Sequence, residues 1–197
     1  MDQIFLKKTK FLPHCDLELQ LKLVESEINI IVGQNGIGKT SFLHYFAEHL
    51  GSNKSILLDQ NPMPWFYTRK LKVIKQLMLD NDLHDFNQEY FFKLWNQMSL
   101  DQLEDRLTED LSGGEFQSLR LCLALARDTE YYLLDEPSHY LDSSRKIILS
   151  KLFKEMIIQK KKVIIVEHDH DWIESKKNFQ KFILENGKLK VGESWSI

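Results

Sequence analysis

The sequence has few cysteines and no long apolar run. Its two cysteines, Cys15 and Cys122, lie far apart and belong to no pair with metal-ligand spacing, which suits a reducing compartment. We expect both thiols to be chemically inert. No apolar run approaches the roughly 20 residues that a membrane-spanning helix needs, and the N-terminus lacks the charged-then-apolar pattern of a signal peptide. These absences predict a cytoplasmic protein.

Neither sign of charge is in large excess. Lys and Arg number 26 against 29 Asp and Glu, which gives a formal net charge of −3. This balance gives no reason to expect a phosphate-backbone partner, so we predict that no nucleic acid is bound. Repeats and low-complexity linkers are also missing. With 43% hydrophobic residues in 197, the chain can bury the core of one compact domain.

Three of the eight glycines form one loop. The run Gly33-Gln34-Asn35-Gly36-Ile37-Gly38-Lys39-Thr40 follows an apolar segment, 28–32, and opens a helical pattern. Strand, glycine loop and helix are the setting of a phosphate-binding loop, because backbone N–H groups can wrap around phosphate oxygens only where no Cβ intervenes. Lys39 would neutralise the β and γ phosphates, and the Thr40 hydroxyl would reach Mg²⁺. We predict nucleotide binding at this loop.

Apolar periodicity around this loop alternates between strands and helices. We expect strands at 4–8, 17–23, 28–32, 55–60, 131–136 and 163–166, a hairpin at 182–191 that turns at Asn186-Gly187, and helices from 39 to about 50 and from 142 to about 157. Between 68 and 107 the pattern is helical. One face of this insert is expected to be buried in a small helical subdomain; it holds Tyr90, Phe91, Leu94, Trp95 and Met98. Off that face, Phe92 is our candidate for an exposed protein contact, together with Trp65 and Phe66.

A second glycine motif, Leu111-Ser112-Gly113-Gly114-Glu115, precedes a long apolar-periodic helix. Ser112 and Glu115 have the spacing of a capping box. Two glycines in a first helical turn cost roughly 1 kcal/mol each against alanine, so helix stability alone does not explain them. Exposed N–H groups at this helix start suggest a second anion site.

Two apolar strands end in polar groups. The first ends in Asp135 and Glu136, a pair that suits Mg²⁺ binding and the orientation or deprotonation of an attacking water. The second is followed by 167–171, Glu-His-Asp-His-Asp, which superficially resembles a metal cluster; we favour a polar donor to the phosphate chemistry instead. Asp142 is expected to cap the helix that follows the first strand.

Taken in order, the phosphate loop, Gln60, the LSGGE segment, Leu133-Leu134-Asp135-Glu136-Pro137, Leu141-Asp142 and His168 resemble the motifs of an ABC-family ATPase. The resemblance covers nearly the whole chain. It implies an α/β fold of the P-loop NTPase type, with a mostly parallel central sheet, a short N-terminal antiparallel β part and an inserted helical subdomain. Residues 1–60 and 116–197 would form the nucleotide-binding core of one domain, and residues 61–115 the helical subdomain that ends in the signature LSGGE.

The resemblance also implies ATP and Mg²⁺ as ligands and gives each motif a role. The triphosphate would be held by Gly33, Gln34, Asn35, Gly36, Ile37, Gly38, Lys39, Thr40 and Ser41. Asp135 and Gln60 would serve Mg²⁺, Gln60 would also touch the attacking water, Glu136 would be the catalytic base, and His168 would contact the γ-phosphate as a switch. A second copy's nucleotide would meet the signature residues Ser112, Gly113, Gly114 and Glu115, and Asp142 would act across the dimer seam.

Four departures from the family pattern stand out. Only twenty residues separate Lys39 from Gln60, so most of the usual antiparallel β extension is missing. No clear tyrosine is placed to stack on adenine; Phe11 fits that spacing best and Phe5 less well. Ser118 stands where an arginine often follows the signature, with Arg120 two positions on. Glu115 replaces the commoner glutamine.

Two functions stay open. The leading one is the ATP-hydrolysing subunit of a membrane transporter, a homodimer or heterodimer of cassettes on the cytoplasmic face, with membrane-spanning subunits on separate chains. The alternative is a soluble ABC ATPase that drives an assembly process such as iron–sulfur cluster assembly. A DNA-repair ATPase is disfavoured because long heptad segments are missing, and a two-cassette translation factor because 197 residues hold one phosphate loop and one LSGGE. A non-hydrolysing sensor is disfavoured because Glu136 and His168 are both present.

Overall fold

The computed structural model describes residues 3–12, 15–22, 28–59, 68–80, 85–169, 172, 179–185 and 188–192. Its main sheet has six strands in the order β4 (Ser55–Leu58), β5 (Tyr131–Asp135), β6 (Lys162–Val166), β3 (Ile28–Val32), β7 (Phe179–Glu185) and β8 (Lys188–Val191). All neighbours are parallel except β7 and β8. A separate antiparallel pair consists of β1 (Gln3–Leu12) and β2 (Cys15–Lys22). The expected mostly parallel sheet with an N-terminal antiparallel part is confirmed.

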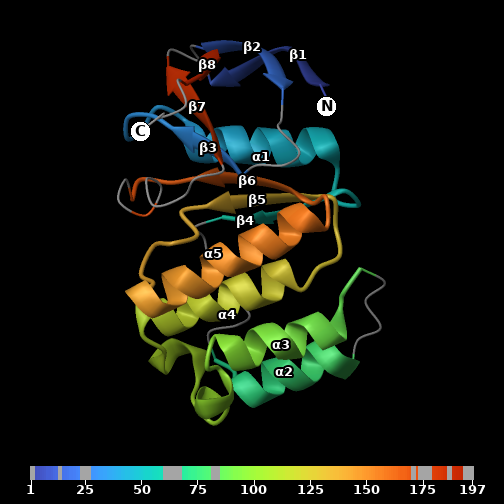
Figure 1. Cartoon of the computed structure of the whole chain (residues 1–197), viewed down its shortest axis with the longest axis vertical. Coiled ribbons are helices and arrows are strands. Elements are labelled where there is room, and N and C mark those ends of the chain that lie inside the picture. Colours follow the sequence, from blue (N-terminus) through green and yellow to red (C-terminus); the bar gives the residue numbers. More distant parts are fainter. Residues whose placement is uncertain are drawn as a thin grey trace.

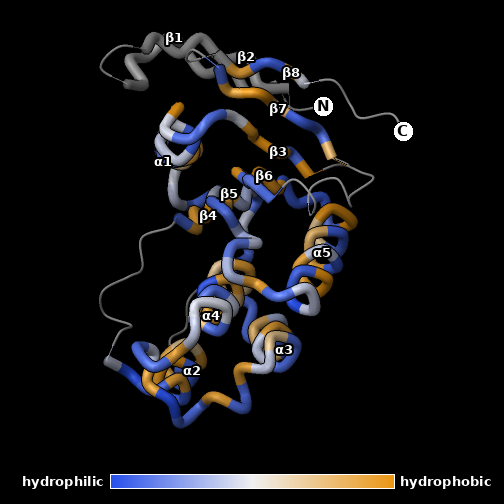
Figure 2. Tube along the Cα trace, turned by 90° about the vertical axis from the view of Figure 1, so that its left-hand side faces the viewer, coloured by the Kyte–Doolittle hydropathy of each residue, from blue (hydrophilic) through white to orange (hydrophobic). Residues whose placement is uncertain are grey.

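The elements form layers (Figure 1). Helix α1 (Lys39–Leu50) lies between the β1–β2 pair and the strands β6, β5 and β4. Helices α4 (Gly113–Leu125) and α5 (Ser143–Ile158) cover the opposite face of the sheet, and α2 (Leu71–Asp80) and α3 (Gln88–Gln97) lie beyond α4. Figure 2, turned by 90°, shows the same order. Two short 3₁₀ helices, η2 (Asp101–Leu103) and η3 (Thr108–Asp110), lead from α3 to α4.

The side chains of β5 point alternately into two hydrophobic cores, one on each face of the sheet. Tyr131 and Leu133 are buried with α1 on one face, whereas Tyr132 and Leu134 are buried with the helices of the other face. Successive strand residues point to opposite faces, so a central strand covered on both sides must be apolar throughout. The continuous apolar runs that the sequence shows in β5 and β6 therefore have a structural cause.

The predicted helical face is confirmed, but it does not form a core of its own. Phe91, Leu94, Trp95 and Met98 are fully buried and Tyr90 is partly buried, in the same cluster as residues of α4, α5 and the sheet. Phe92 is 40% exposed, as expected. Trp65 and Phe66 lie outside the described residues. Helix α4 is continuous through the expected boundary between residues 115 and 116.

Strands β4, β5 and β6 differ from their predicted bounds by one or two residues at one end, and β1, β2 and β7 differ by more. Strand β1 is longer than 4–8 and its register with β2 shifts twice, and β2 is displaced toward the N-terminus relative to 17–23. Strand β7 begins at Phe179 instead of 182, because its backbone pairs with β3 from Ile28 onward. Such pairing leaves no trace in the apolar pattern. The hairpin of β7 and β8 is confirmed, while its turn at Asn186-Gly187 lies outside the described residues.

Candidate functional site

The loop between β3 and α1 has the backbone that the glycines predicted. Gly36 and Gly38 have φ angles of 77° and 102°, in the left-handed region that favours glycine. A Cβ on Gly33 would lie 2.7 Å from the Leu184 carbonyl oxygen, so this glycine permits a close backbone approach. Helix α1 has Gly38 as its N-cap residue and no side-chain cap. Its first N–H groups are therefore suited to receive an anion.

Lys39 folds back over this loop. Its Nζ donates to the carbonyl oxygens of Gly33 at 2.9 Å and Gln34 at 2.8 Å. Burial lowers the pKa of Lys39, and the nearby negative charges of Glu136 and Asp135 oppose that shift. The ammonium group is thus held where phosphate oxygens would approach the loop.

Thr40 joins the loop to the end of β5. Its hydroxyl donates to Asp135 Oδ2 at 2.6 Å, while the buried Asp135 Oδ1 has no hydrogen-bond partner among the described residues. Burial raises the pKa of Asp135, which the Glu136 and Asp59 charges reinforce and the Thr40 hydrogen bond opposes. A buried carboxylate oxygen without a partner is costly unless a ligand completes it. This oxygen and the Thr40 hydroxyl are ligands that fit Mg²⁺.

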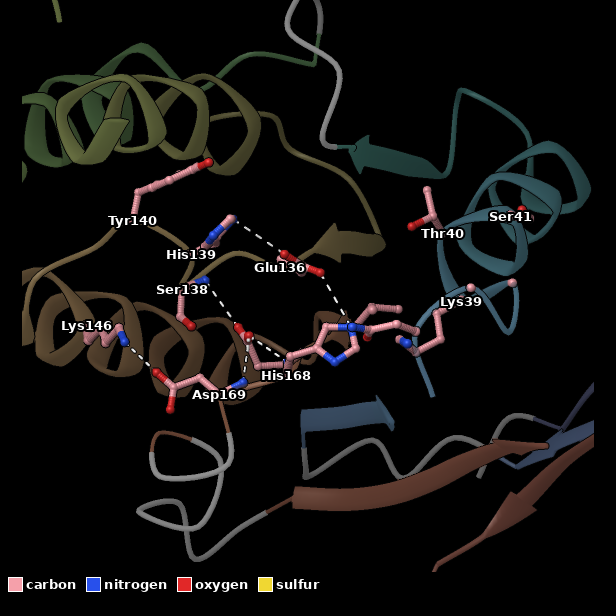
Figure 3. Close-up of a pocket in the computed structure, with 15 residues that line it drawn as sticks. Lys39, Thr40, Ser41, Glu136, Ser138, His139, Tyr140, Lys146, His168 and Asp169 are labelled. Atoms are coloured by element: carbon pink, nitrogen blue, oxygen red, sulfur yellow. Dashed lines mark hydrogen bonds and ion pairs between the residues drawn. The ribbon is translucent and has the colours of Figure 1, made fainter. Parts of the chain in front are cut away.

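Glu136 lies between two histidines (Figure 3). Its Oε1 is 3.5 Å from Nε2 of His168, and its Oε2 is 3.4 Å from Nδ1 of His139. The backbone of Glu136 has a φ of 48°, which is uncommon for a residue with a side chain. Its N–H donates to the Val166 carbonyl at 2.9 Å. The sequence predicted His168 in this surrounding but not His139.

The buried carboxylate of Glu167 connects the two loops at the edge of the site by hydrogen bonds. Its carboxylate accepts from the backbone N–H groups of Ser138 at 3.2 Å, His168 at 2.9 Å and Asp169 at 3.2 Å. Asp169 also pairs with Lys146 of α5. The sequence pattern did not predict this role, although a carboxylate directly after a fully buried strand is a signal for it. No metal-holding cluster occurs among the described residues, and His170 and Asp171 lie outside them.

These groups surround one pocket of about 720 Å³. Eight predicted site residues line it: Asn35, Gly36, Gly38, Lys39, Thr40, Ser41, Glu136 and His168. The carbonyl oxygens of Gly33 and Gln34 accept hydrogen bonds from Lys39, which lines the pocket. Ile37 packs against the hydrophobic core beside α1. Gln60 lies outside the described residues, as does the side chain of Phe11. The signature residues 112–115 and Asp142 do not line the pocket.

The signature segment forms the start of α4 and has the predicted capping box. Ser112 Oγ accepts from the Glu115 N–H at 3.3 Å, and Glu115 Oε2 accepts from the Ser112 N–H at 2.8 Å. A Cβ on Gly113 would lie 3.1 Å from the Tyr140 ring, and a Cβ on Gly114 would lie 2.7 Å from the Tyr140 carbonyl oxygen. Both glycines therefore permit close packing on Tyr140, a contact that the sequence pattern did not predict.

Asp142 caps α5, as predicted. It accepts from the Arg145 N–H at 2.9 Å and from the Ser144 hydroxyl at 2.6 Å. These hydrogen bonds lower the pKa of Asp142, the one from Ser144 most. The carboxylate remains half exposed, at 53%, and is accessible to a partner.

The chain is similar in sequence and in fold to known proteins. The family model described as ABC transporter matches residues 17–139. Translation initiation factor rli1 of Schizosaccharomyces pombe is 35% identical over 159 residues, which are 78% of this chain and 26% of that protein. The chain thus spans about a quarter of that relative's length.

Two further proteins match over nearly their whole length. ABC transporter E family member 3 of Arabidopsis thaliana is 29% identical over 175 residues, 80% of this chain and 95% of that protein. A dimeric bacterial ABC transporter cassette has a similar fold, with a TM-score of 0.71 at 18% identity over 98% of this chain and 97% of that one. Since the family model covers more than half of the chain, this protein belongs to the ABC transporter family and is an ABC-family ATPase cassette with the P-loop fold.

Proposed function

We propose that the chain binds ATP with Mg²⁺ in the 720 Å³ pocket and hydrolyses it after closing against a second cassette. The observation that carries this proposal is the common placement of Lys39, Thr40, Glu136 and His168 around one cavity. Lys39 and Thr40 belong to the P-loop and the first turn of α1, Glu136 directly follows β5, and His168 lies in the loop after β6.

Mg²⁺ fits the donor set beside the P-loop. Thr40 and Asp135 would hold it, with Gln60 as the predicted third group, and it would neutralise charge on the β and γ phosphates. The buried Asp135 Oδ1, which has no hydrogen-bond partner in the part of the chain that the structure describes, supports this assignment. The Thr40 hydrogen bond keeps the carboxylate turned toward the loop.

Lys39 and Glu136 have complementary parts in the reaction. The Lys39 ammonium would exchange its two carbonyl acceptors for β and γ phosphate oxygens. Glu136 would accept a proton from the water that attacks the γ-phosphorus, while the bond between that phosphorus and the bridging oxygen breaks to give ADP and phosphate. General base catalysis of this kind contributes about 10²–10⁴-fold in rate. His168, which lies beside the Glu136 carboxylate, would donate a hydrogen bond to a γ-phosphate oxygen.

A second cassette would complete the site. The signature residues 112–115 do not line the pocket of their own chain, although their helix start is suited to an anion. In a closed pair, Ser112, Gly113 and Gly114 of one copy would reach the γ-phosphate bound by the other. The similarity in fold to a dimeric bacterial cassette supports this arrangement.

For the partner, we propose membrane-spanning transporter subunits on separate chains, with this cassette on the cytoplasmic face. Exposed Phe92 on α3 supports a protein contact at the helical part, and the E family relative that matches almost completely is named a transporter. Within the described residues, none of the helices has the length and apolar character needed to cross a membrane.

A soluble ATPase is the second candidate, and the 35% identity to a translation initiation factor favours it. A length of 197 residues does not exclude a translation factor, since the match covers only a quarter of that protein and this sequence can correspond to part of a longer chain. A function in translation would also contradict our expectation that no nucleic acid is bound.

Co-purification distinguishes the two candidates. Tagged protein would be isolated from its native cells in mild detergent, and the co-purifying chains would be identified. The transporter proposal predicts a polytopic membrane protein whose recovery falls when Phe92→Ser removes the exposed ring. Ile158→Ser, at an 81% exposed position of α5, is the matched control and should leave recovery unchanged. A ribosomal or other soluble partner at near-equal amount, without a membrane chain, would overturn the proposal in favour of the second candidate.

A further inference from the structure

The Glu136 carboxylate has a second histidine neighbour that the family resemblance does not supply. Nδ1 of His139 lies 3.4 Å from Oε2, on the oxygen that His168 does not approach. Figure 3 shows the carboxylate between the two imidazole rings. Each oxygen of the proposed base thus has its own histidine.

The ring of His139 stacks on the ring of Tyr140. The two rings stack at a centroid distance of 3.8 Å and an interplanar angle of 22°. Tyr140 in turn rests against the start of α4, where Gly113 leaves room for its ring and Gly114 for its carbonyl oxygen. A φ of 64° at Tyr140 shows that its backbone adopts an uncommon conformation to do so. The position of His139 is therefore tied to the signature helix of the same chain.

The backbone of Glu136 is fixed, but its side chain needs lateral contacts to keep one direction. The N–H donates to Val166 at 2.9 Å and the carbonyl accepts from Gln117 Nε2 at 3.4 Å. These bonds do not restrain the terminal carboxylate, whose last torsion is soft. The His139 ring beside Oε2, opposite the His168 ring beside Oε1, limits that torsion. A general base must lie within hydrogen-bond reach of the proton it removes, so this restriction bears directly on the reaction.

We propose that His139 is a positioning residue for Glu136. Its Nδ1–H holds Oε2, and the stack on Tyr140 fixes the ring so that the carboxylate is directed at the attacking water. Because Tyr140 packs on Gly113 and Gly114, the same contact links the base of one site to the signature segment that would serve the other nucleotide. The inference rests on the proposed role of Glu136 as the base.

Two substitutions test the hydrogen-bond donor and the aromatic ring of His139 one at a time. His139→Phe keeps an aromatic ring for the stack and removes the donor, whereas His139→Asn keeps an amide N–H near the place of Nδ1 and removes the ring. We expect His139→Phe to lower kcat for ATP by about tenfold with KM within about twofold, and His139→Asn to restore at least about half of the lost rate. His139→Leu, a second variant without a donor, should behave as His139→Phe does.

Controls make each result decisive. His49→Phe and His49→Asn, at an exposed position in the last turn of α1, should keep wild-type turnover. Wild-type turnover in both His139→Phe and His139→Leu, or equal losses in His139→Phe and His139→Asn, would overturn the inference. A rise in KM with unchanged kcat would also overturn it, since His139 would then serve nucleotide binding. Glu136→Gln measured in parallel tests the base itself: if that variant keeps its turnover, the proposed function fails rather than the part assigned to His139.

Discussion

Thr40 and Asp135, 95 positions apart in the sequence, are joined by a 2.6 Å hydrogen bond from the Thr40 hydroxyl to Asp135 Oδ2. This bond connects the P-loop on one side of the pocket to the end of β5 on the other. Asp135 is only 2% exposed, and its second oxygen has no partner within the described part of the chain. The pair therefore provides a buried, oriented carboxylate at the site proposed for Mg²⁺.

Asp135→Asn tests that placement. The amide keeps an acceptor for Thr40 but removes the charge, so Mg²⁺ should no longer strengthen nucleotide binding and turnover should fall at least about tenfold. Titration of a fluorescent ATP analogue, with Mg²⁺ or with EDTA, measures the effect. Burial raises the pKa of Asp135, so its ionised form destabilises the nucleotide-free fold at neutral pH. The variant should thus melt no lower than the wild type, and a wild-type response to Mg²⁺ would exclude Asp135 as a ligand.

Gly114→Ala tests the packing of the signature helix on Tyr140. The new Cβ would lie 2.7 Å from the Tyr140 carbonyl oxygen, and backbone must move to admit it. We expect a loss of about 1–3 kcal/mol in the free energy of unfolding, partly offset by alanine's higher helix propensity. Gly113→Ala is the matched control, because its Cβ meets only the exposed Tyr140 side chain. Urea unfolding should rank Gly114→Ala below Gly113→Ala; equal stabilities would mean that the close approach is unimportant.

The capping box gives a pH-dependent prediction. Hydrogen bonding from the Ser112 N–H lowers the pKa of Glu115, so its contribution to stability is present above the unfolded-state pKa, about 4.3, and is lost as the pH falls through the lower folded-state value. Glu115→Gln should be less stable than wild type at pH 7 by about 0.5–1 kcal/mol, and the gap should narrow below about pH 5. Urea melts across this range measure it, with exposed Glu109→Gln as control. A gap that does not change with pH would rule out a role for the Glu115 charge.

Ser112→Arg tests the division of the site between two copies. A large cation at the start of α4 should block the γ-phosphate of the partner and abolish turnover, while ATP binding by the isolated monomer stays nearly intact. Ser112→Ala is the control: it loses the cap, worth about 1 kcal/mol of stability, but leaves the space open. Equilibrium binding to monomer and steady-state turnover are the two readouts. Loss of monomer binding would mean that Ser112 serves its own fold or nucleotide.

Local rules predicted much of the fold. The P-loop glycines, the Ser112–Glu115 capping box and the Asp142 cap each depend on residues a few positions apart, and the structure contains all three. The central strands were also predictable, because burial on both faces demands the unbroken apolar runs seen in β5 and β6. His139 and Glu136 are only three positions apart, yet their contact depends on an uncommon backbone conformation at Glu136 that the sequence does not reveal.

The missed contacts join distant segments. Glu167 reaches Ser138 across 29 positions, and Tyr140 packs on Gly113 and Gly114, because the strand order brings the ends of β5 and β6 together over α4. Apolar periodicity gives each element but not its neighbours in the sheet. Gln60 and the adenine contact of Phe11 stay predictions, since the first residue and the second side chain lie outside the described part of the chain.

Glu136→Gln tests the central claim most directly. The amide cannot accept the proton of the attacking water, so turnover should fall at least about tenfold, equivalent to roughly 1.4 kcal/mol of barrier, while ATP binding is retained. Light scattering with size exclusion in the presence of Mg-ATP should then find a trapped dimer that returns to monomer when ATP is removed. Unchanged turnover would contradict the assignment of Glu136 as the base, and with it the proposed mechanism.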